Sequence, residues 1–167
     1  RIHEVLEKLN ISDVDLVMNL QGDEPLINIE DIKKLNDLMI KEKSYIGTLG
    51  SEINDDKLYE NQNIVKVQTK EDLKISYFSE AANFTRSISN IEKNIYHHLG
   101  IYCYKLKALQ DFVSLKQTQG EIKYKLEQLR ALENNLQIKV GLAKSSPIGV
   151  DTKEDFVAVK KIMEYKS

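Results

Sequence analysis

Several features that define particular classes of protein are rare or absent in this sequence. It contains a single cysteine, Cys103, which excludes an internal disulfide and favours a reducing, cytoplasmic compartment. No apolar run approaches the roughly twenty residues of a membrane-spanning helix, so no membrane association is expected. The net charge of −2, with lysines and acids intermixed, gives no general attraction for nucleic acid. The composition, with 41% hydrophobic and 30% charged residues, is typical of a soluble globular protein.

A glycine-rich loop that opens a helix, the usual cradle for the phosphates of a nucleotide, is also missing from the sequence. The chain begins with Arg1 rather than methionine, and Ile2, Val5 and Leu6 already follow a helical spacing with no targeting signal before them. We therefore expect the remainder of a longer protein, with any phosphate-binding loop in its absent amino-terminal part.

The 167 residues suffice for one domain, 1–167, and the hydrophobic pattern predicts strands that alternate with helices. Helices are expected over about 1–10, 28–43, 108–115, 118–133 and 153–165. Strands are expected over 15–20, 45–50, 64–69, 74–79, 96–105 and 137–143, with a polar loop over 80–95. This alternation predicts an α/β fold with a mixed, mostly parallel sheet flanked by helices.

Asp23 is the first candidate for a metal ligand. It lies in the turn Gln21–Pro25, directly after the predicted strand 15–20. In an open α/β sheet, ligands bind at the carboxyl ends of the strands, where a carboxylate can hold a metal ion against a phosphate. The alternative is structural, because glycine, aspartate and proline all form turns and an aspartate often closes a turn on its own backbone.

Asp151 is the candidate for a second carboxylate, at the end of the short extended run Pro147–Val150. Two acids at strand ends suit Mg²⁺, for which phosphates and waters supply the remaining oxygen ligands. The alternative is again structural: Asp151 with Glu154, or Thr152 with Asp155, can cap the last helix.

The strand expected over 96–105 has a strong two-residue period. Leu99, Ile101 and Cys103 share one face, and His98, Gly100, Tyr102 and Tyr104 share the other. The second face leaves room for a polar ligand, although a half-buried strand with a solvated side gives the same pattern.

The helix expected over 118–133 begins with a capping-box spacing, Thr118 and Glu121. Its core stripe is predicted to consist of Ile122, Leu126, Leu129 and Leu132. From this pattern alone, Glu127, Gln128 and Arg130 are surface residues.

Five segments occur in an order that resembles one family: VMNLQGDEPLI, YFSEA, HHLGIYCYK, KLEQLRALENN and GVDTKEDF. They are similar to the 3-deoxy-manno-octulosonate (KDO) cytidylyltransferases over almost the whole chain. The resemblance implies a nucleotide-diphospho-sugar transferase-like fold that lacks its first strand and loop. It also implies a Mg²⁺-dependent reaction of CTP with KDO, a 2-keto sugar acid, giving CMP-KDO and pyrophosphate for lipopolysaccharide biosynthesis, and a homodimer.

The resemblance also implies the roles of individual residues. Asp23 and Asp151 are expected to hold the metal, and Gln21 is expected to face the sugar. Four residues are expected to bind the sugar's hydroxyls and carboxylate region: His98, Tyr102, Glu127 and Gln128. This implication replaces the surface interpretation of Glu127 and Gln128.

One position departs from the family pattern, because Glu80 stands where the family usually has arginine after Tyr-Phe-Ser. Arg86 is a candidate to compensate, and an amino-substituted KDO is an alternative substrate because Glu80 can pair with an ammonium group. The sequence also leaves open an acylneuraminate cytidylyltransferase and a non-catalytic nucleotide-sugar-binding remnant. The 167 residues alone are expected to be inactive.

Overall fold

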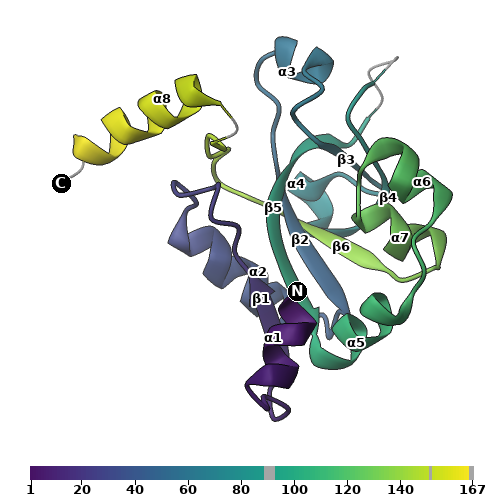
Figure 1. The fold of residues 1–167 in the computed structure, drawn as a ribbon. Coiled ribbons are helices and arrows are strands. Elements are labelled where there is room, and N and C mark those ends of the chain that lie inside the picture. The colour runs from purple at the N-terminus through teal and green to yellow at the C-terminus, as the bar shows by residue number, and fades with distance from the viewer. Residues whose placement is uncertain (89–92, 151, 166–167) are drawn as a thin grey trace.

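A mixed sheet of six strands organises the part of the chain that the computed structural model describes, which is residues 1–88, 93–150 and 152–165. The strands are β1 (Leu16–Asn19), β2 (Ile46–Ser51), β3 (Lys66–Thr69), β4 (Phe78–Thr85), β5 (Ile95–Lys105) and β6 (Ile138–Leu142). Their order is β1-β5-β2-β6-β4-β3, and β3 also pairs with β5. The strands from β5 round to β3 therefore close on one another, and β1 is added outside β5 (Figure 1).

Helices cover the sheet on two sides. They are α1 (Ile2–Lys8), α2 (Ile29–Lys41), α3 (Lys57–Glu60), α4 (Leu73–Ser76), α5 (Leu106–Ser114), α6 (Gln119–Tyr124), α7 (Gln128–Glu133) and α8 (Lys153–Glu164). Leu35 and Met39 of α2 pack with Leu99 and Cys103 of β5 in one core. Helices α5 and α7 contribute to a second core, which contains Tyr102. Helix α8 projects from the body of the molecule (Figure 1).

The α/β fold with a mixed sheet and flanking helices is confirmed, but the expected predominance of parallel pairing is wrong for this chain. Among the pairings between described residues, β2–β6 alone is parallel. A parallel pair needs a crossover of about a dozen residues or more. The connection from β3 to β4 contains only the four-residue helix α4, so these neighbours run antiparallel.

Two predictions around α4 are corrected. The strand expected over 74–79 is wrong at its start, because the Asp72 side chain caps α4 and Tyr77 ends that helix with φ 58°. The loop expected over 80–95 is wrong over its first six residues, which belong to β4. The pairing of β4 with β3 shifts register between Gln68 and Thr69. This irregularity removes the alternation by which a strand is recognised in a sequence.

The helix expected over 118–133 is in fact two helices. The capping box of Thr118 and Glu121 forms at the start of α6 as expected. Lys125 then adopts a left-handed conformation, φ 53°, which ends α6 before α7 begins. Because of this break, Ile122 is 62% exposed, not part of a core stripe, whereas Leu126 remains buried.

The strand expected over 15–20 forms as β1, but it is less buried than expected. It lies at the end of the sheet order, and Val17 is its buried residue. Within the described ranges, no helix combines the length and the apolar character that crossing a bilayer requires.

Candidate functional site

The turn Gln21–Pro25 leaves β1 and lies against β5. A side-chain oxygen of Glu24, Oε1, accepts a hydrogen bond from the backbone N–H of Gly100 at 2.7 Å. A Cβ atom at position 100 would lie only 2.8 Å from Oε1 of Gln21. The space that Gly100 leaves on this face is therefore occupied by side chains of the turn, not kept entirely for a ligand.

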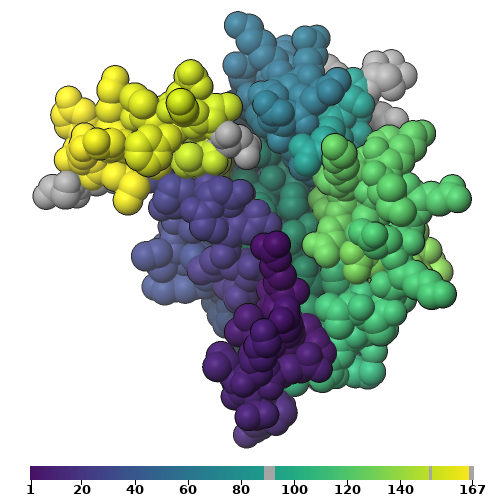
Figure 2. Space-filling model, viewed as in Figure 1, coloured from purple at the N-terminus to yellow at the C-terminus, as the bar shows by residue number. Residues whose placement is uncertain are grey.

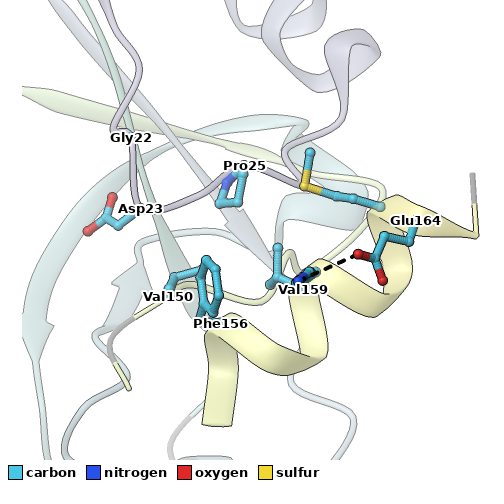
Figure 3. Close-up of a pocket in the computed structure, with 9 residues that line it drawn as sticks. Gly22, Asp23, Pro25, Val150, Phe156, Val159 and Glu164 are labelled. Carbon is cyan, nitrogen blue, oxygen red and sulfur yellow. Dashed lines mark ion pairs between the residues drawn. The ribbon is translucent and has the colours of Figure 1, made fainter. Parts of the chain in front are cut away.

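Asp23 is exposed in the same turn. Its backbone carbonyl accepts a hydrogen bond from the N–H of Val150 at 2.8 Å. The segment that precedes the second predicted acid thus runs beside the first acid. In Figure 3 the Asp23 carboxylate points away from Pro25 and Phe156. Asp151 itself lies outside the described residues.

The start of α8 decides between the two capping alternatives. Thr152 is the N-cap residue: its Oγ1 accepts a hydrogen bond from Asp155 N at 3.2 Å, and the Asp155 carboxylate accepts from Thr152 N at 2.9 Å. This capping box satisfies the helix start with Thr152 and Asp155. The helix therefore does not require Asp151 as its cap.

A pocket of about 820 Å³ lies between the turn and α8 (Figure 3). Its walls are mostly apolar and include Val150, Phe156 and Val159, with Asp23 at its edge. His98 and Tyr102 do not line it. This pocket is therefore not the place where the predicted sugar-binding residues come together.

His98 is buried and neutral. Burial, together with the neighbouring His97, lowers the pKa of His98 to about 3. Its Nε2 lies 3.0 Å from Thr48 Oγ1, and that hydroxyl donates to the carbonyl of Ile101 at 2.6 Å. Since the single hydroxyl proton is used there, Nε2 of His98 must carry the proton that joins the two side chains. Nδ1 of His98 is consequently a hydrogen-bond acceptor.

Tyr102 lies next to His98, with ring centroids 5.4 Å apart. Burial, followed by the charges of Tyr104 and Glu127, raises the pKa of Tyr102 well above its usual value. The phenol therefore keeps its proton at physiological pH. Its buried hydroxyl has no hydrogen-bond partner among the residues that the structure describes.

Glu127, at the start of α7, forms an ion pair with Arg130. Arg130 Nη2 lies 3.3 Å from Glu127 Oε1 and 2.5 Å from Glu121 Oε1, and Arg130 Nε donates to Glu121 Oε2 at 2.8 Å. The Arg130 side chain is only 12% exposed and the Glu121 side chain 6%. The expectation that Arg130 is a solvated surface residue is therefore wrong. Gln128 is half-buried beside Glu127.

The elements that carry these residues border one hollow of the surface. Figure 2 shows it between the amino-terminal segments, in purple to indigo, and the green segment that contains α6 and α7, with the colour of β5 at its floor. Strand β5 contributes His98 and Tyr102, the turn Gln21–Pro25 contacts β5 through Gly100, and Glu127 is the N-cap residue of α7. The described members of the predicted sugar-binding set thus come from elements that border this hollow.

Comparisons with known proteins show the family to which the chain belongs. A family model described as cytidylyltransferase matches residues 1–139. The 3-deoxy-manno-octulosonate cytidylyltransferase of Thermodesulfovibrio yellowstonii is 42% identical over 173 residues, which cover 98% of this chain and 68% of that protein. The protein of the same name from Bartonella bacilliformis is 38% identical over 168 residues, which cover 98% and 67%. The chain belongs to the KDO cytidylyltransferase family.

A solved structure supports the same assignment. The CMP:2-keto-3-deoxy-manno-octonic acid synthetase complexed with CTP superposes with a TM-score of 0.84 and 28% identity, covering 99% of this chain and 67% of that one. The inositol-1-phosphate CTP transferase from T. maritima has a TM-score of 0.60 and 15% identity, and shares the fold alone. This KDO cytidylyltransferase chain spans about two thirds of the length of its relatives.

Glu80, the departure from the family pattern, has local partners in this chain. Its carboxylate forms an ion pair with Lys70 and accepts a hydrogen bond from the side chain of Gln137. The hydrogen bond from Lys70 is the largest cause of the lowered pKa of Glu80. Arg86 donates to the carbonyls of Gln62 and Asn63, so it stabilises a loop and does not compensate for Glu80. These contacts argue against a role for Glu80 in sugar choice.

Glu80→Gln is therefore expected to leave kcat/KM within about twofold of the wild type, for KDO and for an amino-substituted KDO alike, as is usual for a surface change away from the site. Steady-state kinetics of the full-length protein with both sugars measures this. A change in the ratio of the two kcat/KM values larger than about fivefold would restore Glu80 to the sugar site, since it corresponds to about 1 kcal/mol of selective binding.

Sequence reasoning misses two residues that make contacts with the candidate site. Glu24 is noticed in the sequence only as a polar neighbour of Asp23 and is given no role, yet it binds the N–H of Gly100 on β5. The helical pattern assigns Arg130 to the surface, yet it joins Glu121 to Glu127. Gly100 within a predicted strand is the available signal for the contact with Glu24, because a glycine in a strand often marks the close approach of another segment.

Proposed function

We propose that this chain forms most of the catalytic domain of an enzyme that joins CTP and KDO into CMP-KDO and pyrophosphate, for lipopolysaccharide biosynthesis. The observation that carries the proposal is the contact of the Gln21–Pro25 turn with Gly100. Two motifs of the family that are far apart in the sequence, QGDEP and HLGIY, meet there. A fold shared by chance would not bring together the motifs that carry the family resemblance.

The proposed reaction is a single in-line transfer. The anomeric hydroxyl oxygen of KDO attacks the α-phosphorus of CTP, the bond from that phosphorus to the bridging oxygen of the β-phosphate breaks, and pyrophosphate leaves. The hydroxyl proton passes to water, and no covalent enzyme intermediate forms. Catalysis of this kind depends mainly on positioning the reactants and on neutralising phosphate charge.

The proposed sugar-binding groups have complementary hydrogen-bonding roles. Nδ1 of His98 accepts, the protonated phenol of Tyr102 donates, and the carboxylate of Glu127 accepts. Gln21 and Gln128 carry amides that can do either. A buried hydroxyl without a partner costs about 1–3 kcal/mol. An oxygen of the sugar acid that reached Tyr102 would remove this cost, which supports the assignment.

Asp23 and Asp151 are proposed to hold Mg²⁺, and the residues fit this ion. The exposed Asp23 carboxylate supplies the hard oxygen donors that Mg²⁺ prefers, and the hydrogen bond from Val150 to Asp23 joins the two acid-bearing segments. Two carboxylates are enough when phosphates and waters fill the other positions. When bound, the ion supplies positive charge against the phosphate oxygens.

Pyrophosphate release from CTP, KDO and Mg²⁺ tests the function. The full-length protein is expected to turn over, whereas the 167-residue chain alone is expected to release no pyrophosphate above the background rate. The inactivity expected of the 167-residue chain is supported by the relative from Thermodesulfovibrio yellowstonii, of which this chain covers 68%. No release by the full-length protein would favour the non-catalytic remnant, and release by the 167-residue chain would refute the dependence on further residues. The homodimer stays a prediction of the resemblance, and the cytoplasmic location stays a prediction from the single cysteine.

A further inference from the structure

The backbone N–H of Gly100 lies at a gap in the pairing of β5. On one edge of β5, the described pairing with β3 stops at His97 and the pairing with β1 starts at Tyr102. On the other edge, the register with β2 jumps from Leu99 to Tyr102. Glu24 Oε1 accepts the Gly100 N–H at 2.7 Å in partly buried surroundings. The Glu24 carboxylate thus takes the place of a strand partner, with a charge-assisted bond stronger than a neutral one.

The turn approaches position 100 so closely that a larger residue there would have to displace side chains of the turn. A Cβ atom there would lie 2.8 Å from Oε1 of Gln21 and 3.0 Å from Oε1 of Glu24. The backbone of Gly100 has no positive φ, so an alanine at this position is not strained. The atoms it would displace are the ends of two flexible side chains. Alanine at position 100 should therefore move Gln21 and Glu24 without disturbing the sheet.

The same turn contains Asp23, whose carbonyl is bound to Val150 N. The position of this turn therefore affects both the side chain of Gln21, which is proposed to face the sugar, and the segments that carry the two acids. We propose that Glu24 is a positioning residue: through the N–H of Gly100 it fixes the turn that presents Gln21 to the sugar acid and Asp23 to the metal. This role rests on the proposed function.

Three variants of the full-length protein test the role of Glu24. Glu24→Ala removes the acceptor, Gly100→Ala displaces it, and Glu24→Gln keeps an amide oxygen that can accept the same N–H. The first two are expected to raise the KM for KDO about tenfold and to lower kcat about tenfold, since a misplacement of about 1 Å at a reacting centre costs about 10²-fold in all. The KM for CTP should stay within about twofold and the melting temperature within about 2 °C. Glu24→Gln should restore the KM for KDO to within about threefold of the wild type.

Exchange of the Gly100 amide with deuterium, followed by NMR, gives a readout that does not depend on activity. Protection at Gly100 should be lost in Glu24→Ala and kept in Glu24→Gln. Glu30→Ala is the matched control: an exposed glutamate that pairs with Lys33, expected to change neither readout. Absence of turnover by the wild type would refute the proposed function, whereas the exchange result would still test the hydrogen bond between Glu24 and Gly100.

Two results would overturn the positioning role. One is a KM for KDO within about twofold of the wild type in both Glu24→Ala and Gly100→Ala, because the turn would then be placed without this contact. The other is an equal loss of kcat/KM for CTP and for KDO with a melting temperature lowered by more than about 5 °C, which would indicate a merely structural contact. Full protection of the Gly100 amide in Glu24→Ala would refute the hydrogen bond itself.

Discussion

Replacing Asp23 by asparagine in the full-length protein is expected to lower kcat about 10³-fold. Asparagine keeps the size of the side chain but removes the charge that Mg²⁺ needs, and a catalytic metal is worth several kcal/mol of transition-state stabilisation. Asparagine is also a good turn former, so the melting temperature without metal should move by no more than about 2 °C. Pyrophosphate release and thermal denaturation measure the two effects.

Asp151→Asn is expected to behave in the same way, because the capping box of Thr152 and Asp155 secures the start of α8 without it. The double variant should be scarcely less active than either single variant, since both residues serve one ion. Asp37→Asn is the control, an exposed aspartate within α2. Full activity of Asp151→Asn at modest Mg²⁺ would end the two-carboxylate mechanism.

Replacing Arg130 by methionine is expected to destabilise the folded protein by about 3 kcal/mol, because it leaves the Glu121 carboxylate buried without its charged partner. Arg130→Lys should recover only part of this loss, since lysine cannot form the two parallel hydrogen bonds that Arg130 makes to Glu121. Urea denaturation measures both variants. Lys123→Met, at an exposed lysine of α6, should stay within about 0.5 kcal/mol of the wild type.

The contribution of Arg130 should also depend on pH in a defined direction. The hydrogen bonds from Arg130 are the largest cause of the lowered pKa of Glu121 in the folded state. A carboxyl group with a lowered folded pKa stabilises the protein above its unfolded pKa of about 4.3 and loses this contribution as the pH falls through its folded pKa. The difference between the wild type and Arg130→Met should therefore be complete at neutral pH and shrink below about pH 4. A constant difference down to pH 3 would contradict this account.

Part of this protein could be predicted from the sequence because the physical cause is local. The two faces of β5 follow from a two-residue period, and the structure places Leu99 and Tyr102 in separate cores as that period predicts. The capping boxes at Thr118 and Thr152 involve side chains three residues apart, so their spacing is visible in the sequence. The KDO cytidylyltransferase family is likewise visible, because its motifs are short and contiguous.

The tertiary structure alone decided how these pieces form a site. Glu24 and Gly100 are 76 residues apart, and no periodicity relates a carboxylate in a turn to an N–H at an irregular point of a strand. Glu121 and Arg130 meet only because Lys125 takes a left-handed conformation, whereas one continuous helix would have kept their side chains apart. Such contacts depend on where the chain returns in space, and a sequence pattern records only the preferences of neighbouring residues.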